Sequence, residues 1–449
     1  MKKALALILI LVLSTSLLAA CGSPSATNSA IPSSSEENTA DSASGGNDSP
    51  KTELVVMSVS GAANEPMNNI VNANIATFNE SNELNVTISM EILESEQYKS
   101  KIATLMAANA QPDIFYTWEG GFLRPFVEGG KVYPVGDAID ADPEWKGRFL
   151  SGVFDPVTYS DGKVYAVPST MQCGVMYYNT RIFQENNLSE PTSWDEFINI
   201  CEILKSKGIV PISMPSEKSW IASELLQEIC NGVGGADLFN KISNGETTWD
   251  EERFVKAGEV FQDMVNKGYF QQGFLGMSQD QGRDMFRNEQ AAMYFMGCWD
   301  NSAVSDPSFP LSKNISLFKL PSYDSANNGT ILGSIGYPFA ISATAKNIEA
   351  ACSFLKMMSN QDAQENFLYE QKSNVVTNID IDESRMDPLT LKTQKILNET
   401  TNLTPWYDRV FGAGEGTEFN NVAIAIAAGE SVEDQMKSLE QFAVDNGAR

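Results

Sequence analysis

The chain has 449 residues, of which 58 are acidic and 31 are basic, so its formal charge is −27, and it contains no histidine. Such an acidic balance without a basic stripe argues against binding to nucleic acid or to anionic lipid surfaces. Without an imidazole, the chain has no Ser-His or Cys-His nucleophile and no histidine-based zinc site. An enzyme would depend on paired carboxylates, as glycosidases do, and no acidic pair stands in a recognisable catalytic context.

The N-terminus has the three parts of a secretion signal. Two lysines precede the apolar residues 4–13, and Ala19 and Ala20 end the segment before Cys21. The apolar run is too short for a spanning helix, which needs roughly 17–25 residues. Leu-Ala-Ala-Cys resembles the bacterial lipobox, so we expect residues 1–20 to be a lipoprotein signal peptide and Cys21 to carry lipid. In the alternative interpretation, the signal is an ordinary one and Cys21 is incidental.

The composition changes after Cys21. Residues 22–50 are mostly Ser, Asn, Ala, Gly and acidic residues, and Ile31 is their one large aliphatic side chain. Such a segment cannot bury enough apolar surface to fold. We therefore predict that residues 21–50 form a disordered tether, which as a flexible coil spans on the order of 30 Å.

The remaining residues, 51–449, are numerous enough for more than one hydrophobic core. Their cysteines are odd in number and widely spaced, without a C-x-x-C pair. This pattern predicts small buried apolar residues and no disulfide framework. The cysteines are Cys173, Cys201, Cys230, Cys298 and Cys352.

Strands and helices alternate at the start of this region. Residues 53–59, 86–92 and 113–117 have the apolar character of strands, and helical spacing of apolar residues marks 67–78 and 98–106. The alternation predicts an open, mainly parallel sheet. In such sheets ligands bind beyond the carboxyl ends of the strands, which here are the loops 58–64 and 118–121.

A second α/β region begins near Gln172. Ser193 and Glu196 have the spacing of a capping box ahead of an amphipathic helix that Gly208 ends. The C-terminal third has helical character, with a capped last helix from Ser431. Further along the chain we predict a buried strand over 291–297, a loop over 298–300, a strand over 338–343 and a helix over 348–358.

Four segments in order resemble the extracellular solute-binding proteins of ABC importers, specifically the large carbohydrate-binding family that includes maltodextrin-binding protein. They cover nearly the whole region after residue 50, and each alone is a weak signal. In residues 286–299, Asn288-Glu289-Gln290 replace the family's usual Gly-Lys. The segments are GKVYAVPSTMQCGVMYYNTRIF (162–183), PTSWDEF (191–197), FRNEQAAMYFMGCW (286–299) and AISATAKNIEAACSFLKMMSNQDAQ (340–364).

The resemblance implies a two-lobe, type II periplasmic-binding-protein-like fold, with two open α/β sheets joined by a multi-strand hinge and a helical C-terminus. Lobe 1 would comprise residues 51–169 and 322–372. Lobe 2 would comprise residues 173–318 and 376–449. The hinge segments would lie near 170–172, 319–321 and 373–375.

The resemblance also implies a function. Such a receptor closes its lobes on a carbohydrate and is recognised by the ABC permease in the closed form. It carries out no catalysis and needs no cofactor or metal. We expect a monomer held at the outer face of the cell membrane through lipid on Cys21 alone, without a nucleic-acid partner.

Aromatic residues on loops at strand ends are the first candidates for ligand contact, because flat rings cover the apolar face of a sugar. Trp299 follows a buried strand and matches the family's ligand-stacking tryptophan. Trp118, with Tyr116 and Glu119, ends the third predicted strand. The family's acidic ligand contact falls on Gln172, an uncharged amide, which argues against a close match to maltodextrin specificity. For both tryptophans, packing in the core is the alternative interpretation.

Further candidates come from the second half of the chain and from the first loop. Trp220 lies where the family often places an aromatic residue in lobe 2, and Trp406 with Tyr407 matches a C-terminal platform. Asp300 and Glu65 are possible hydroxyl acceptors, with a helix cap or a solvated loop charge as the alternative. We assign Trp194 to structure, while Trp145 and Trp249 carry no functional signal.

Two other functions remain open at this stage. One is a receptor for a non-sugar solute such as a polyamine or a glycerophosphodiester. The other is a glycoside-active enzyme with two carboxylates. The pair Tyr177-Tyr178 also suggests a ferric-ion binder, but Tyr178-Asn179 matches a structural motif of the whole family, which favours a structural role.

Overall fold

The computed structural model describes residues 51–60 and 65–447. The predicted signal peptide, Cys21, the predicted tether and part of the loop 58–64 lie outside the described residues. So does the side chain of Glu65, although its backbone belongs to the first helix. In the part that is described, no helix combines the length and apolar character needed to cross a membrane.

One sheet of the described region has four strands in the order β2-β1-β3-β9. The strand β1 runs parallel to both β2 and β3, whereas β9, from far along the chain, is antiparallel to β3. This arrangement confirms the mainly parallel sheet predicted from the sequence. The strands are β1 (Thr52–Ser60), β2 (Val86–Glu94), β3 (Ile114–Tyr116) and β9 (Phe339–Ile341).

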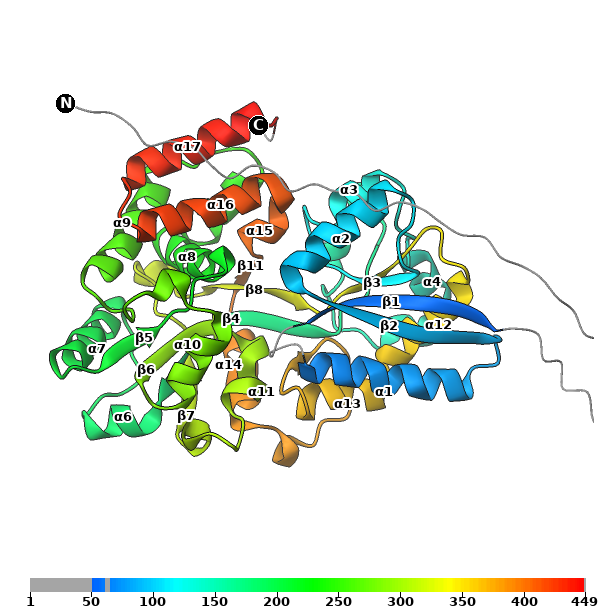
Figure 1. Ribbon diagram of the computed structural model, residues 1–449, viewed down its shortest axis with the longest axis horizontal. Coiled ribbons are helices and arrows are strands. Elements are labelled where there is room, and N and C mark those ends of the chain that lie inside the picture. The colour runs from blue at the N-terminus through cyan, green and yellow to red at the C-terminus, as the bar shows by residue number, and fades with distance from the viewer. Residues whose placement is uncertain (1–50, 61–64, 448–449) are drawn as a thin grey trace, which may run out of the picture. The chain divides into compact units, whose positions relative to one another are not determined.

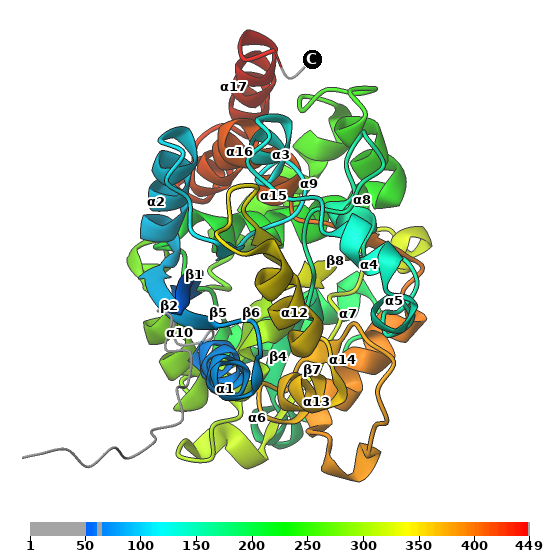
Figure 2. The ribbon, with the colours of Figure 1, turned by 90° about the vertical axis from the view of Figure 1, so that its right-hand side faces the viewer.

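Helices cover both faces of this sheet. Figures 1 and 2 show α1 (Glu65–Ser81) and α2 (Ser95–Ala107) on opposite sides of β1 and β2. In α2 the buried residues are Tyr98, Ile102 and Met106, four residues apart, so they form one apolar stripe toward the sheet. The other helices around this sheet are α3 (Arg124–Glu128), α4 (Gly136–Ala141), α5 (Pro143–Gly147), α12 (Ile348–Met358) and α13 (Gln361–Tyr369).

A second sheet of the described region is built around β4 (Thr170–Asn179). The first residues of β4 pair with β8 and β10, and its later residues pair with β6 and β7. The strand order is β11-β8-β4-β6-β5, with β7 and β10 also paired to β4. The strands are β5 (Val210–Ser213), β6 (Ala291–Gly297), β7 (Ile315–Phe318), β8 (Thr330–Gly336), β10 (Asn374–Val375) and β11 (Asn402–Thr404).

The long helix α8 (Ser219–Ser243) lies at the centre of the second region and packs against β8, α9 and α16. Its axis is broken at Gly235, which has φ of +65°. The neighbouring helices are α6 (Thr180–Glu185), α7 (Trp194–Ser206), α9 (Glu252–Asn266), α10 (Gln279–Arg287), α11 (Asn301–Val304), α14 (Pro388–Glu399), α15 (Tyr407–Val410), α16 (Gly412–Ala427) and α17 (Val432–Asp445).

Most local predictions agree with the structure. The predicted strand 291–297 and the predicted helix 348–358 have the bounds of β6 and α12. Ser431 caps the last helix by accepting a hydrogen bond from the backbone of Asp434. The strand predicted over 338–343 is shorter, and the segment predicted as a loop is one turn of 3-10 helix, Cys298–Asp300.

The capping box at the start of α7 is half formed. The Ser193 hydroxyl accepts a hydrogen bond of 3.3 Å from the backbone N–H of Glu196, as predicted. The Glu196 carboxylate instead accepts a bond of 2.7 Å from the N–H of Thr192. Gly208, with φ of +76°, follows the end of this helix.

The cysteines within the described residues are free. Cys173, Cys201, Cys230 and Cys298 are buried, and Cys352 is half-buried. The prediction that these cysteines are mostly small buried residues is therefore confirmed for this part of the chain.

A buried carboxyl group on α8 makes the stability of the protein depend on pH. Glu228 is 4% exposed, and its carboxylate accepts a 2.8 Å hydrogen bond from the N–H of Leu332 in β8. Burial is the main cause that raises its pKa from 4.5 to about 7. Because the pKa is higher in the folded protein, this group stabilises the fold most fully below its unfolded pKa, and that stabilisation is lost as the pH rises through about 7.

We therefore expect the free energy of unfolding to fall by up to about 3 kcal/mol between pH 4.5 and pH 8 on account of this group. Glu228→Gln should remove this part of the pH dependence. Urea unfolding at several pH values measures it, with Glu252→Gln at an exposed position as the control. Parallel pH curves for wild type and Glu228→Gln would contradict the assignment.

Candidate functional site

A cavity of about 270 Å³ lies beyond the carboxyl ends of β1 and β3. Val59 and Tyr116 mark the two strand ends, and Gln172 of β4 lies in the opposite wall. The cavity is therefore where an open α/β sheet places a ligand. Of the predicted site residues, those in its lining are Tyr116, Trp118, Gln172, Trp220 and Trp299.

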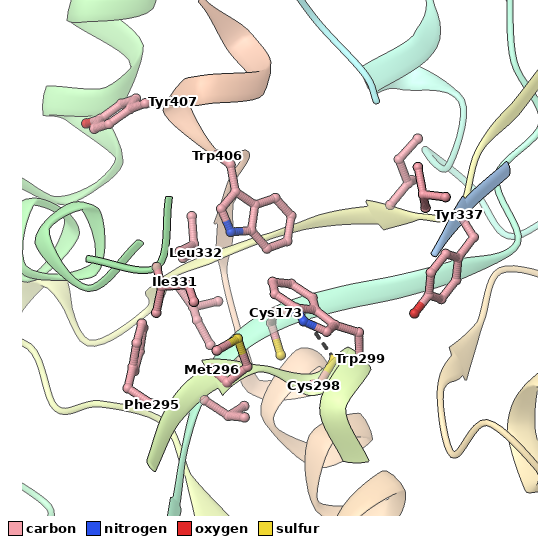
Figure 3. Packing of buried hydrophobic residues seen from close by; sticks show 14 of the residues in the cluster. Cys173, Phe295, Met296, Cys298, Trp299, Ile331, Leu332, Tyr337, Trp406 and Tyr407 are labelled. Carbon is pink, nitrogen blue, oxygen red and sulfur yellow. Dashed lines mark hydrogen bonds between the residues drawn. The ribbon is translucent and has the colours of Figure 1, made fainter. Parts of the chain in front are cut away.

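Trp299 stands on the turn that follows β6. Its ring centroid lies 6.2 Å from that of Trp220 and 5.7 Å from that of Trp406. Figure 3 shows the indoles of Trp299 and Trp406 next to each other, with Tyr337 on the other side of Trp299. A Cβ atom at Gly297 would come within about 2 Å of the Trp299 ring, so the indole needs a glycine two residues before it.

A buried ion pair holds this turn in place. Asp300 is fully buried, and its two oxygens accept hydrogen bonds of 2.7 and 2.9 Å from Arg283 of α10. The hydroxyl of Tyr294 donates a further bond to the same carboxylate. We predicted Asp300 as a ligand acceptor, but its oxygens point into the protein. Its role in the structure is to position the turn that carries Trp299.

The wall opposite Trp299 is aromatic. Trp118 is half-buried and contacts Tyr116 edge to face, with 4.8 Å between the ring centroids. The ammonium of Lys99 lies 5.2 Å from the centre of the Trp118 ring. Burial raises the pKa of Tyr116 above its ordinary value, so its hydroxyl is neutral at physiological pH.

Glu119, which we predicted beside Trp118, does not line the cavity. It is 1% exposed, and its carboxylate lies 3.5 Å from the guanidinium of Arg409. Arg409 does line the cavity, and its guanidinium lies over the Trp406 ring, 3.8 Å from the ring centre. Glu119 thus positions a cation that the sequence interpretation missed.

The structure does not bring the predicted C-terminal platform to the cavity. Trp406 is 1% exposed and lies behind Trp299, under Arg409. Tyr407 belongs to a separate aromatic core, where it stacks on Phe239 with 5.7 Å between centroids. Figure 3 shows Tyr407 set apart from the Trp299 and Trp406 indoles. Trp406 therefore supports the wall from within, and Tyr407 stabilises a different part of the core.

A pair of hydrogen bonds from α8 fixes the segment that carries Arg409. The side-chain amide of Gln227 donates to the carbonyl of Pro405 and accepts from the N–H of Tyr407, both at 2.8 Å. One helix turn further, the amide of Asn231 donates to the hydroxyl of Thr404. The connection between β11 and α15 is thereby tied to α8.

Three polar side chains of the cavity wall have hydrogen-bonding capacity to spare. The Glu224 carboxyl and the Gln172 amide line the cavity and are 5% and 4% exposed. The Trp406 side chain is a hydrogen-bond neighbour of Glu224, whose carboxyl can accept further bonds. The hydroxyl of Tyr337 lies near the Gln371 amide without a hydrogen bond of normal geometry. Burial raises the pKa of Glu224, the nearby charge of Arg409 opposes that shift, and Asp408 adds to it.

Glu224 and Tyr337 were not predicted. Glu224 gave no signal, because it lies inside a helix whose residues are buried on nearly every side. For Tyr337 the sequence does carry a signal, because this residue stands in Gly336-Tyr337-Pro338 between two buried strands. Its backbone φ is +49°, a conformation that costs energy for a bulky residue and is often found at functional sites.

Comparison with known proteins agrees with this geometry. The family model described as bacterial extracellular solute-binding protein matches residues 62–365. The multiple sugar-binding protein of Streptococcus mutans is 26% identical over 338 residues, which are 70% of this chain and 77% of that relative. An uncharacterized ABC transporter extracellular-binding protein of Pyrococcus horikoshii is 28% identical over 228 residues, which cover 50% of this chain and about half, 52%, of that relative.

Solved structures extend the likeness over nearly the whole fold. A protein studied for xylan utilization by the thermophilic bacterium Caldanaerobius polysaccharolyticus has a TM-score of 0.81 and 30% identity, covering 87% of this chain and 99% of that one. A chitin oligosaccharide binding protein, at 21% identity, has a TM-score of 0.82 and covers 89% and 100% of the two chains. This chain therefore belongs to the bacterial extracellular solute-binding proteins, the ABC-importer receptors of two-lobe α/β fold that its sequence motifs resemble.

Proposed function

We propose that this chain is a lipid-anchored extracytoplasmic receptor that captures a sugar or short oligosaccharide and delivers it to an ABC permease. The observation that carries the proposal is the composition of the cavity wall. The indole rings of Trp299 and Trp220 line the same cavity as the buried polar groups of Glu224 and Gln172, which can accept or donate hydrogen bonds to a ligand. A sugar ring has an apolar C–H face and a rim of hydroxyl groups, and binding it requires both kinds of surface.

The aromatic wall can contribute a large part of the binding free energy that a receptor needs. Micromolar binding requires about 8 kcal/mol. Burial of an aromatic side chain contributes roughly 1.5–3 kcal/mol, so Trp299, Trp220 and Trp118 together supply much of it. Hydrogen bonds to Glu224, Gln172 and Arg409 add orientation, because a hydroxyl that leaves water needs a partner.

The walls of the cavity come from both proposed lobes, so closure of the lobes would enclose a ligand between them. In the proposed division, lobe 1 is 51–169 with 322–372 and lobe 2 is 173–318 with 376–449, joined near 170–172, 319–321 and 373–375. Trp118 then belongs to lobe 1, and Trp220 and Trp299 belong to lobe 2. The ion pair between Glu94 and Lys218, 3.0 Å apart, also joins the two sides. Opening the lobes would break this pair, and closing them on a ligand would restore it.

The alternatives fit the cavity less well. A polyamine receptor needs a surplus of free carboxylates around its ligand. The walls carry five carboxylates and three cations, Lys99, Lys218 and Arg409, and two of the carboxylates are already paired. A glycoside-active enzyme needs a paired acid and nucleophile or base. Asp280 and Glu94 in the lining are each already engaged, with Arg283 and Lys218.

Titration of the intrinsic tryptophan fluorescence against a carbohydrate panel tests the proposal. The panel consists of xylo-oligosaccharides, chito-oligosaccharides, raffinose and stachyose, with spermidine and glycerophosphocholine as non-sugar ligands. We expect at least one carbohydrate to shift the spectrum and raise the melting temperature, and chromatography to recover it unchanged. A response to the non-sugar ligands alone, or hydrolysis of the sugar, would contradict the proposal.

Trp299→Ala should weaken carbohydrate binding at least about tenfold, or 1.4 kcal/mol, because one stacking surface is lost. Calorimetric titration measures the affinity, and circular dichroism checks that the variant is folded. The matched control is Tyr323→Ala, an aromatic residue 42% exposed and outside the cavity lining. Equal affinity in Trp299→Ala and wild type would remove this indole from the site.

A further inference from the structure

A second cavity, of about 500 Å³, adjoins the ligand cavity. The two share wall residues, among them Trp118, Lys218, Trp220 and Arg409, so they are compartments of one groove. Figure 1 shows the elements around the second compartment, with α2 and α3 on one side and α15 and α16 on the other. The inner compartment alone is slightly below the ordinary range of ligand sites, about 300–1,000 Å³.

The two sides of the second compartment differ in character. On one side a row of rings continues from Trp118: its centroid lies 4.9 Å from that of Phe122, which lies 5.9 Å from that of Phe126. Both phenylalanines are half-buried and line the compartment. The other side is formed by small and polar residues of α16, including Ala413, Thr417 and Asn420.

This arrangement repeats the chemistry of the inner compartment. The rings of this wall meet edge to face, at 75° for Trp118 and Phe122 and at 89° for Phe122 and Phe126, so they present apolar edges and faces in turn. Such a wall suits the C–H groups of successive sugar rings, and a polar wall opposite suits their hydroxyl groups. An extended groove with one aromatic wall fits a linear chain of such rings better than a single compact solute.

We propose that the second compartment holds further units of the same carbohydrate, so that the preferred ligand is a linear oligosaccharide running from Trp299 to Phe122 and Phe126. This inference rests on the proposed function. It adds that the chain selects for ligand length, and that Phe122 and Phe126 set this selectivity while Trp299 and Trp220 bind the first unit.

Calorimetric titration with xylose, xylobiose, xylotriose and xylotetraose tests it, or with the corresponding lengths of whichever panel series binds. We expect affinity to rise at least about tenfold from the shortest ligand that binds to the longest. Phe122→Ala should abolish this rise while changing the affinity for the shortest ligand less than about twofold. Phe126→Ala serves as the second variant, and Tyr323→Ala is the control.

The outcomes separate the two proposals. Failure of every carbohydrate to bind would overturn the proposed function. Binding with equal affinity at all lengths, or an equal loss at all lengths in both phenylalanine variants, would overturn the length selectivity and leave the sugar receptor standing.

An independent feature lies behind the wall that carries Trp299. Gly174 and Gly297 are the last antiparallel pair between β4 and β6, and Cys173 and Cys298 are the residues next to them, just beyond the end of this ladder. The backbone N–H of Cys173 donates to the sulfur of Cys298, 3.3 Å away. Directly opposed residues of antiparallel strands have Cα atoms about 4.5–5.5 Å apart, within the 4.4–6.8 Å that a disulfide needs. Cys298 is the first residue beyond such a pair, and its sulfur already contacts the backbone of Cys173.

We infer that Cys173 and Cys298 form a disulfide when the chain folds under oxidising conditions. The oxidant is a small-molecule disulfide. The two cysteine thiols give up two protons and two electrons as their S–S bond forms, and the S–S bond of the reagent is reduced to two thiols. The bridge would join β4 to the turn that follows β6. The residues next to the two cysteines, Gln172 and Trp299, both lie in the cavity wall.

Refolding in a mixture of oxidised and reduced glutathione, followed by alkylation and peptide mass spectrometry, tests this inference. We expect the peptides of Cys173 and Cys298 to be linked, and the melting temperature to exceed that of the protein refolded with reductant. Cys201→Ala should keep the link, and Cys298→Ala should lose it. Two alkylated thiols in the oxidised sample, or a link to another cysteine, would overturn the inference.

Discussion

The site depends on one buried interaction, the bidentate ion pair between Arg283 and Asp300. Both side chains are withdrawn from water, with 1% and 0% exposed. Removing one partner from such a pair typically costs about 3–5 kcal/mol, because the other charge is left uncompensated. The pair fixes a single turn at the end of β6 and with it the plane of Trp299. Trp220, Trp406 and Cys298 are all placed relative to that turn, so a charge interaction that never meets the ligand determines the shape of the ligand's wall.

The helix α8 is the second organising element. Its N-terminal end supplies Trp220 and Glu224 to the cavity, and its next turns bind the backbone around Trp406 through Gln227. Glu228, four residues after Glu224, faces β8 instead. A helix buried on nearly all sides can carry polar residues only where each meets a defined partner. Glu224, one turn earlier, has the Trp406 side chain as its neighbour and also faces the cavity.

Sequence patterns predicted the elements well because those patterns are local. The alternation of strands and helices, the strand before Trp299 and the cap at Ser193 all depend on residues a few positions apart. The site was predicted less completely. Aromatic residues at strand ends led correctly to the cavity, but whether a residue there faces solvent depends on what covers it. Asp300 and Tyr407 are covered by Arg283 and by a separate aromatic core, whereas Arg409, which pairs with the buried Glu119, lines the cavity. Such pairings join distant parts of the chain and leave no local pattern.

The backbone of Tyr337 gives the cavity a mechanical property. β8 belongs to the second sheet and β9 to the first, and only Tyr337 and Pro338 separate them. Proline fixes its own φ, so a swing of one sheet against the other at this crossing must be taken up by the torsion angles of the tyrosine. The same residue presents its ring to the cavity. A guest in contact with the ring therefore acts directly on one of the connections between the two sheets.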